Sequence, residues 1–152
     1  MGTLSYSLLD AAATHDYLNL AGGAIGNGMP LATGAAFACP DRKVISLQAD
    51  GSAMYTLQAL WTQAREKLDI TTIIYANRAY RVLLEELKGV GAAYTGPKAL
   101  SMMDLRDPTL NWLKLAEGMG IAAVQVDGVR ALADAVRSSI GSRGPKLIEA
   151  IM

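Results

Sequence analysis

A carboxylate and an amide each follow a segment that is predicted to be a buried strand. Asp50 comes directly after residues 43–49, and Asn77 comes directly after residues 70–76, and both segments are rich in β-branched residues. Mg²⁺ prefers oxygen ligands and usually combines one or two protein oxygens with phosphate oxygens and water. The two side chains therefore indicate a site for a metal ion and a phosphate group.

The residues next to this pair suit the same chemistry. Gly51 has no Cβ and lets the backbone approach a phosphate, while the amides of Ser52 and Ala53 begin the following helix, where an anion is favoured. The Ser52 hydroxyl is a further donor, and the Ala79 carbonyl is a third candidate metal ligand. A turn with a helix cap is the alternative, because these residue types are common there for local reasons. The residue types alone leave both interpretations open.

The elements that would position the pair form a strand–helix–strand unit. A helix is predicted over residues 55–68, because its apolar residues recur at helical spacing, and Trp61 is expected to be one of its core residues. Such a unit makes its strands parallel, and ligands of open parallel sheets bind beyond the carboxyl ends of the strands. We therefore expect Asp50 and Asn77 at the same edge of a sheet.

The whole pattern predicts an α/β fold: one domain over residues 1–152, with an open, mainly parallel sheet and helices on both faces. Residues 1–17 show no clear pattern and are expected to be irregular. Residues 92–107 are expected to be a long loop, with Met102 and Met103 facing the substrate side. Further helices are expected at residues 28–38, 110–117 and 129–140, and further strands at residues 121–126 and 146–151.

The composition fits a compact domain and gives no reason to expect nucleic acid or a membrane as a partner. Hydrophobic residues make up 51% of the chain, and Lys plus Arg number 14, as do Asp plus Glu. No apolar run is long enough to span a bilayer. Cys39 is the single cysteine, so an internal disulfide is excluded and a cytoplasmic location is expected. Cys39 itself is expected to be a small buried hydrophobe.

Three ordered blocks resemble thiamin diphosphate-dependent enzymes of the acetolactate synthase and benzoylformate decarboxylase group. Asp50-Gly51-Ser52 followed by Asn77 is similar to the family's cofactor motif, GDG(S) and then NN after a gap of like length. Residues 22–36 resemble the glycine-rich segment that precedes this motif, and residues 52–62 are similar to benzoylformate decarboxylase. The resemblance extends from about residue 20 to residue 150, and it implies the thiamin diphosphate-binding fold.

The resemblance implies a role for each residue of the metal and diphosphate site. The side chains of Asp50 and Asn77 and the backbone carbonyl of Ala79 would hold Mg²⁺. Gly51 and Ser52 would hold the diphosphate of thiamin diphosphate.

Other positions match residues that contact the rings of the cofactor. The carbonyl of Gly23 would accept a hydrogen bond from the aminopyrimidine, and Ile25 would wedge between the two rings and force their V shape. Val82 and Leu83 match positions that line the cofactor or substrate pocket. Ordinary core packing remains the alternative for Ile25, and simple helix packing for Val82 and Leu83.

Two residues depart from the family motif. Ala49 replaces the first glycine of GDG, and Ala76 replaces the first asparagine of NN. Neither position supplies a metal-binding oxygen in the family, so metal binding is expected to survive. The methyl group of Ala49 is expected to weaken cofactor binding. Ala76 lacks a side-chain amide, so the loop that contains Asn77 is expected to be less rigid.

The resemblance covers only the C-terminal, diphosphate-binding domain of a longer enzyme, so no catalytic residue is assigned to this chain. In the family, the activating glutamate belongs to a pyrimidine-binding domain of the same or another subunit, so that domain is an expected partner. The expected assembly is a homo-oligomer such as a dimer. The expected function is a thiamin diphosphate and Mg²⁺ dependent decarboxylase or carboligase acting on a 2-oxo acid, most like acetolactate synthase. The alternatives are a benzoylformate decarboxylase-like or 2-hydroxyacyl-CoA lyase-like enzyme, a non-catalytic cofactor-binding module, and an interaction remnant.

The remaining charged residues have ordinary interpretations beside functional ones. His15 is either a proton-transfer group or a surface histidine, and Arg78 and Arg81 either meet an anionic ligand or are solvated loop charges. The glutamates are expected at the solvated surface or in helix charge pairs such as Glu85 with Lys88. The set considered comprises Glu66, Glu85, Glu86, Glu117 and Glu149.

Overall fold

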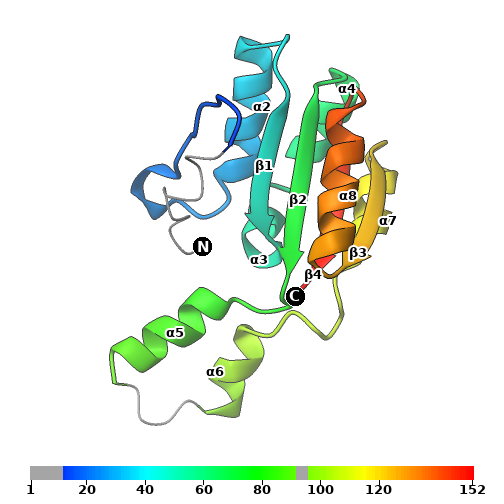
Figure 1. Cartoon of the computed structure of the whole chain (residues 1–152). Helices are drawn as coiled ribbons and strands as arrows, with labels where there is room; N and C mark the ends of the chain where they lie inside the picture. The colour runs from blue at the N-terminus through cyan, green and yellow to red at the C-terminus, as the bar shows by residue number, and fades with distance from the viewer. Residues whose placement is uncertain (1–11, 92–95) are drawn as a thin grey trace.

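A parallel sheet of four strands organises the protein, and helices cover both of its faces (Figure 1). The computed structural model describes residues 12–91 and 96–152. The strands are β1 (Val44–Ala49), β2 (Ile70–Ala76), β3 (Ala122–Asp127) and β4 (Lys146–Ile151), and they lie in the order β1-β2-β4-β3. All three neighbouring pairs are parallel, as the strand–helix–strand pattern predicts.

Three helices cover one face of the sheet. These are α2 (Gly28–Ala38), α4 (Ala59–Arg65) and α7 (Trp112–Gly118). Their buried residues pack against Ile70, Ile74 and Leu147 of the sheet. Most of the small residues predicted in α2 are alanines, which pack at close range, and Ala32 and Ala36 are buried there.

Helix α8 (Val129–Ile140) covers the opposite face. Its residues Leu132 and Val136 pack on Ile73, Ile148 and Ala150 of the central strands β2 and β4. The prediction of helices on both faces is therefore confirmed. The bounds of α2, β2, α8 and β4 also match the predicted ranges.

The segment after β1 is less regular than the sequence predicts. A short helix α3 (Asp50–Ala53) and a 3-10 turn η2 (Met54–Thr56) precede α4, so the predicted helix over residues 55–68 is shorter and begins later. It ends before Lys67, whose φ of 52° is left-handed and incompatible with a continuing helix. The short turns keep Asp50 at the carboxyl end of β1.

The long connection between β2 and β3 contains two helices. Helix α5 (Arg81–Gly89) follows residues 77–80, here called the Asn77 loop, and α6 (Pro97–Met102) lies within the range predicted to be a loop. That prediction is wrong for residues 97–102, because Pro97 at the first helical position has no amide that needs a partner and its fixed φ suits the first turn. Figure 1 shows α5 and α6 beyond the carboxyl ends of the strands.

Three side chains are not where the sequence predicts them. Trp61 is 52% exposed, because its neighbour Leu60 faces the core while its own ring lies against Arg65, whose guanidinium carbon is 4.8 Å from the ring centre. Cys39 is exposed, since it follows the last turn of α2 at the surface. Glu149 is only 5% exposed, because β4 is a central strand that is covered on both faces.

The start of the chain is only partly described. Residues 1–11 lie outside the described range, and residues 12–17 belong to no helix or strand, as expected for that part of the segment. A short 3-10 turn, η1 (Ala21–Gly23), begins the glycine-rich segment. None of the helices described is both long and apolar enough to cross a membrane.

Candidate cofactor-binding site

The carboxylate of Asp50 joins the ends of β1 and β2. Its side chain is buried, with an exposed fraction of 2% for the residue. Oδ1 accepts a hydrogen bond from the Gly51 amide at 2.9 Å, and Oδ2 accepts one from the Arg78 amide at 2.6 Å. The predicted proximity of Asp50 to the Asn77 loop is therefore confirmed.

Burial makes the charged form of Asp50 unfavourable. It raises the pKa of this carboxyl above its ordinary value, and the hydrogen bonds from the Arg78 and Gly51 amides oppose the rise only in part. No lysine or arginine among the described residues forms an ion pair with it within 4.0 Å. A buried carboxylate without an ion-pair partner is the kind of group that a metal ion stabilises.

Asn77 and Ala79 add neutral oxygens to this site. The Asn77 Oδ1 accepts a hydrogen bond from the Ala79 amide at 3.0 Å, which closes the turn after β2. No described residue donates to the Ala79 carbonyl. A carboxylate, an amide oxygen and a backbone carbonyl are the hard donors that suit Mg²⁺, so the residues present fit this ion.

The Asn77 loop is held from its other side by the segment after α6. The Tyr80 amide donates to the Met103 carbonyl at 2.8 Å, and the Leu105 amide donates to the Arg78 carbonyl at 2.9 Å. These bonds flank an antiparallel bridge between Ala79 and Asp104. Arg78 itself has a left-handed φ of 58°.

Gly51 lies against the ring of Tyr80. A Cβ at position 51 would lie 2.6 Å from the Tyr80 ring, which itself meets Tyr55 edge to face at 6.5 Å between centroids. The Ser52 hydroxyl donates to the Ala49 carbonyl at 3.0 Å. The diphosphate role of Gly51 and Ser52 stays a prediction.

The glycine-rich segment is tied to the same region. The Thr56 hydroxyl donates to the Gly26 carbonyl at 2.6 Å, and a Cβ at Gly26 would lie 2.6 Å from the Tyr55 Cβ. Gly23 and Ile25 precede this contact, and both are exposed. Ile25 is 45% exposed, so ordinary core packing does not explain it, whereas its role as a wedge stays a prediction.

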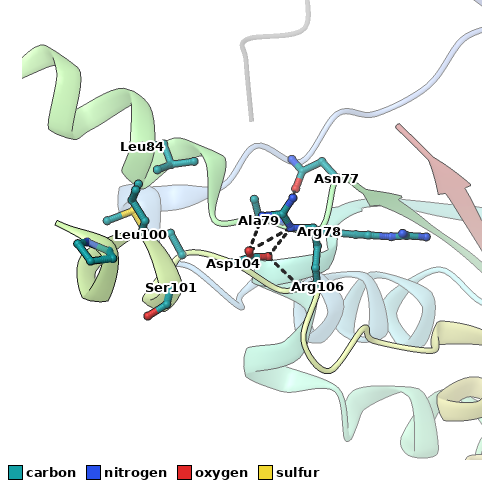
Figure 2. Close-up of a pocket in the computed structure, with 10 residues that line it drawn as sticks. Asn77, Arg78, Ala79, Leu84, Leu100, Ser101, Asp104 and Arg106 are labelled. Carbon is teal, nitrogen blue, oxygen red and sulfur yellow. Dashed lines mark hydrogen bonds and ion pairs between the residues drawn. The ribbon is translucent and has the colours of Figure 1, made fainter. Parts of the chain in front are cut away.

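A cavity of about 510 Å³ opens beside the Asn77 loop, between this loop and the helices α5 and α6 (Figure 2). Asp104 and Arg106 form a bidentate ion pair at the rim of this cavity, and the sequence alone does not single them out. Hydrogen bonds from Arg106 lower the pKa of Asp104 to about 2. Their spacing of two residues is common in turns and carries no specific signal. The lining residues are Asn77, Arg78, Ala79, Leu84, Pro97, Leu100, Ser101, Met103, Asp104 and Arg106.

The hydrophobic candidates lie at the surface near this loop. Val82 and Leu83 lie in the first turn of α5 and are 51% and 47% exposed. Met103 lines the cavity, whereas Met102 is 79% exposed and does not line it, and a substrate-facing role for either residue stays a prediction. The exposure of Val82 and Leu83 argues against the alternative that they only pack within the helix.

The other charged candidates form local contacts. His15 Nδ1 lies 2.8 Å from the Ala13 carbonyl at the surface. Arg81 lies 4.0 Å from Glu85, which also meets Lys88 at 3.3 Å, so the predicted charge pair on α5 is confirmed. Among the described residues no three His, Cys, Asp or Glu side chains form a metal cluster, so a metal at Asp50 would need further oxygens from its ligand.

An acidic residue and an amide at the carboxyl ends of neighbouring parallel strands define a ligand site of the open α/β class, suited to a metal-bound phosphate. Residues 2–150 match the family model described as thiamine pyrophosphate enzyme, C-terminal TPP binding domain, thiamine pyrophosphate being another name for thiamin diphosphate. The chain belongs to this family.

Curated proteins of known families are similar to this chain in sequence. The chain is 50% identical to a Mycobacterium tuberculosis protein provisionally named acetolactate synthase large subunit IlvX, over 99% of this chain and 30% of that protein. It is 33% identical to benzoylformate decarboxylase of Pseudomonas aeruginosa, over 88% of this chain and 24% of that protein. The chain thus spans less than a third of the length of these relatives.

A solved structure agrees with this assignment. The thiamine diphosphate-dependent 4-hydroxybenzoylformate decarboxylase of Rhodococcus jostii superposes with a TM-score of 0.73 at 35% identity, covering 82% of this chain and 22% of that one. The predicted α/β fold and the family resemblance are both confirmed.

Proposed function

We propose that this domain holds thiamin diphosphate through Mg²⁺ and serves a decarboxylase or carboligase acting on a 2-oxo acid, most like acetolactate synthase. The observation that carries the proposal is the buried Asp50 carboxylate, which has no ion-pair partner among the described residues and joins the ends of two parallel strands beside Asn77. The family assignment supports the cofactor, and the 50% identity to a protein named as an acetolactate synthase subunit supports the class of reaction.

Each proposed ligand has a position that suits its role. Asp50 supplies the charged oxygen for Mg²⁺, and Asn77 with the Ala79 carbonyl supplies the neutral oxygens. Gly51 and Ser52 contact the diphosphate at the start of α3. The magnesium ion is itself part of the proposal, and its support is the set of oxygen donors.

The exposed residues near the loop would contact the organic part of the cofactor. Gly23 offers its carbonyl to the aminopyrimidine, Ile25 holds the angle between the rings, and Val82 lines the pocket. Their exposure supports contact with a group outside the core. When bound, thiamin diphosphate supplies an electron sink for carbon–carbon bond cleavage and formation. The chain's own residues bind it, orient it and support the loop.

The activating carboxylate is proposed to lie on a pyrimidine-binding domain outside this chain. Glu85 is paired on the surface of α5, and Glu149 lies on the covered strand β4. The assembly proposed is a homo-oligomer, such as a dimer, in the cytoplasm. Exposed apolar residues around the site, among them Leu20, Ile25 and Val82, support association with another domain.

A benzoylformate decarboxylase-like activity is the second candidate. The 35% identity to the Rhodococcus jostii decarboxylase and the likeness to the Pseudomonas aeruginosa protein favour it. The two candidates differ in the substrate's side chain, which is a methyl group in pyruvate and a phenyl group in benzoylformate. No specific structural observation favours a 2-hydroxyacyl-CoA lyase-like enzyme, a non-catalytic module or an interaction remnant.

Carbon dioxide release separates these candidates. The 152-residue chain is assayed alone and together with its pyrimidine-binding partner domain, with Mg²⁺ and thiamin diphosphate, on pyruvate and on benzoylformate. We expect release only from the mixture, and faster release from pyruvate. Faster release from benzoylformate would favour the second candidate. Robust release from the chain alone would place the catalytic carboxylate within it, and no release from the complete protein with either substrate would exclude both candidate reactions.

A further inference from the structure

A second cavity, of about 220 Å³, lies between the Asn77 loop and the strands β3 and β4. Arg78 lines it from the loop, and Glu149 lines it from β4. The register of the sheet places Glu149 opposite Ile74 on β2 and opposite Gln125 on β3. The full lining comprises Arg78, Thr109, Leu110, Asn111, Leu113, Gln125 and Glu149.

Glu149 is a buried carboxylate with little local support. Its residue is 5% exposed, and its only side-chain hydrogen bond among the described residues comes from the Gln125 amide at 3.3 Å. No lysine or arginine forms an ion pair with it within 4.0 Å in the same ranges. Such a group is unfavourable unless a nearby positive charge compensates it.

Arg78 is the positive charge that faces the same cavity. No hydrogen bond or ion pair joins its guanidinium to a described side chain, and in Figure 2 the side chain extends away from Asp104. Its backbone has a left-handed φ of 58°, which is unfavourable for any residue with a Cβ. Its amide donates to Asp50, and its carbonyl accepts from Leu105, so the backbone of this residue shapes the metal-ligand loop.

We propose that Glu149 is a positioning residue that acts through Arg78. The buried charge of Glu149 attracts the Arg78 guanidinium into the cavity, and this attraction keeps residue 78 in its left-handed conformation. The Arg78 amide then stays on Asp50, and the flanking residues Asn77 and Ala79 keep their oxygens toward the metal. The inference rests on the proposed function, because it concerns the same metal site.

The experiment measures binding of thiamin diphosphate at saturating Mg²⁺ by titration calorimetry on the full-length protein. The variants are Glu149→Gln, which keeps the shape and removes the charge, and Arg78→Ala, which removes the guanidinium and keeps a Cβ at the left-handed φ. We expect each to weaken binding about tenfold, a typical coupling for an interacting pair, and the double variant to be no weaker than either single one. Arg78→Lys, which retains the charge, should bind more tightly than Arg78→Ala.

Matched controls are Glu117→Gln on α7 and Arg137→Ala on α8, both at exposed positions, and they should bind like the wild type. Losses that simply add in the double variant, or a Glu149→Gln variant with unchanged affinity, would overturn the inference. If Asp50→Ala abolishes binding in the same experiment, the proposed function survives that result. A wild-type protein that binds no thiamin diphosphate would overturn the proposed function and this inference together.

Discussion

Asp50 and Arg78 are joined by a short hydrogen bond, from the Arg78 amide to the Asp50 Oδ2 at 2.6 Å. The bond links the turn after β1 to the turn after β2, which are far apart in the sequence. It holds the carboxylate in place before any ligand is bound. The proposed metal ligand is therefore already held in place within this domain, and a cation would compensate its buried charge.

Replacing Asp50 with alanine should abolish Mg²⁺-dependent binding of thiamin diphosphate. The change removes the only carboxylate of the proposed metal shell and leaves the diphosphate charge without its counter-ion. Calorimetry at saturating Mg²⁺ measures the affinity, and circular dichroism checks that the fold persists. Asp134→Ala, which removes an exposed carboxylate on α8, is the matched control and should bind normally. Equal affinity of Asp50→Ala and wild type would remove the basis for the metal assignment.

Replacing Gly51 with alanine should destabilise the protein even without a ligand. The new Cβ would lie 2.6 Å from the Tyr80 ring, so the ring must move, and overpacking of this kind costs about 1–3 kcal/mol. Urea unfolding of the ligand-free chain measures the change. Adding Tyr80→Ala to this variant should cost less than it does in the wild type, because it also relieves the clash.

Gly34→Ala in α2 is the control for this experiment. Nothing lies within 4 Å of a Cβ built at Gly34, and the position is helical, so alanine should stabilise the protein by about 0.5–1 kcal/mol. A Gly51→Ala variant that is as stable as the wild type would show that Tyr80 is free to rotate away.

Replacing Ile25 with alanine should change stability little and turnover strongly. The side chain is 45% exposed, so we expect a loss below about 1 kcal/mol in the free energy of unfolding, whereas Ile74→Ala in the core should lose about 2–5 kcal/mol. If Ile25 sets the angle between the cofactor rings, turnover of the full-length protein should fall more than its affinity for thiamin diphosphate. Unchanged turnover per folded molecule would exclude the wedge role.

Replacing Glu149 with glutamine should make the ligand-free protein more stable at neutral pH. Burial, opposed in part by the Arg78 charge, raises the pKa of Glu149 above its ordinary value of 4.5. A raised pKa means that the ionised side chain is less favourable in the folded than in the unfolded state, so it destabilises the fold above its folded pKa. This penalty disappears as the pH falls below 4.5.

Thermal unfolding from about pH 4 to about pH 8 tests this sign. The midpoint of Glu149→Gln should exceed that of the wild type near neutral pH, and the two should converge at the acidic end of the range. Together with weaker cofactor binding, this result would show that the carboxylate is retained for the site at the expense of stability. A variant less stable than wild type at neutral pH would show instead that the charge supports the fold.

The strands, the parallel topology and the proximity of Asp50 to the Asn77 loop follow from the sequence alone. Residues 70–76 are mostly β-branched and continuous because a central parallel strand is buried on both faces, and a polar residue directly after such a strand falls at the ligand-binding edge. Asp50 and Asn77 can be found in this way, without any knowledge of which residues they contact. The helix over 97–102 escapes prediction because a glycine and a proline usually mark a loop, although proline also suits the first position of a helix.

Which side chains are buried, and which neighbours they meet, depends on packing in three dimensions. Trp61 and Glu149 both occupy regular elements, and local pattern places the tryptophan inside and the glutamate outside, yet the packing of α4 and the central position of β4 reverse both. The contact between Gly51 and Tyr80 and the cavity shared by Arg78 and Glu149 join residues from separate segments. Such contacts depend on how the elements pack against one another, and spacing along one chain does not encode them directly.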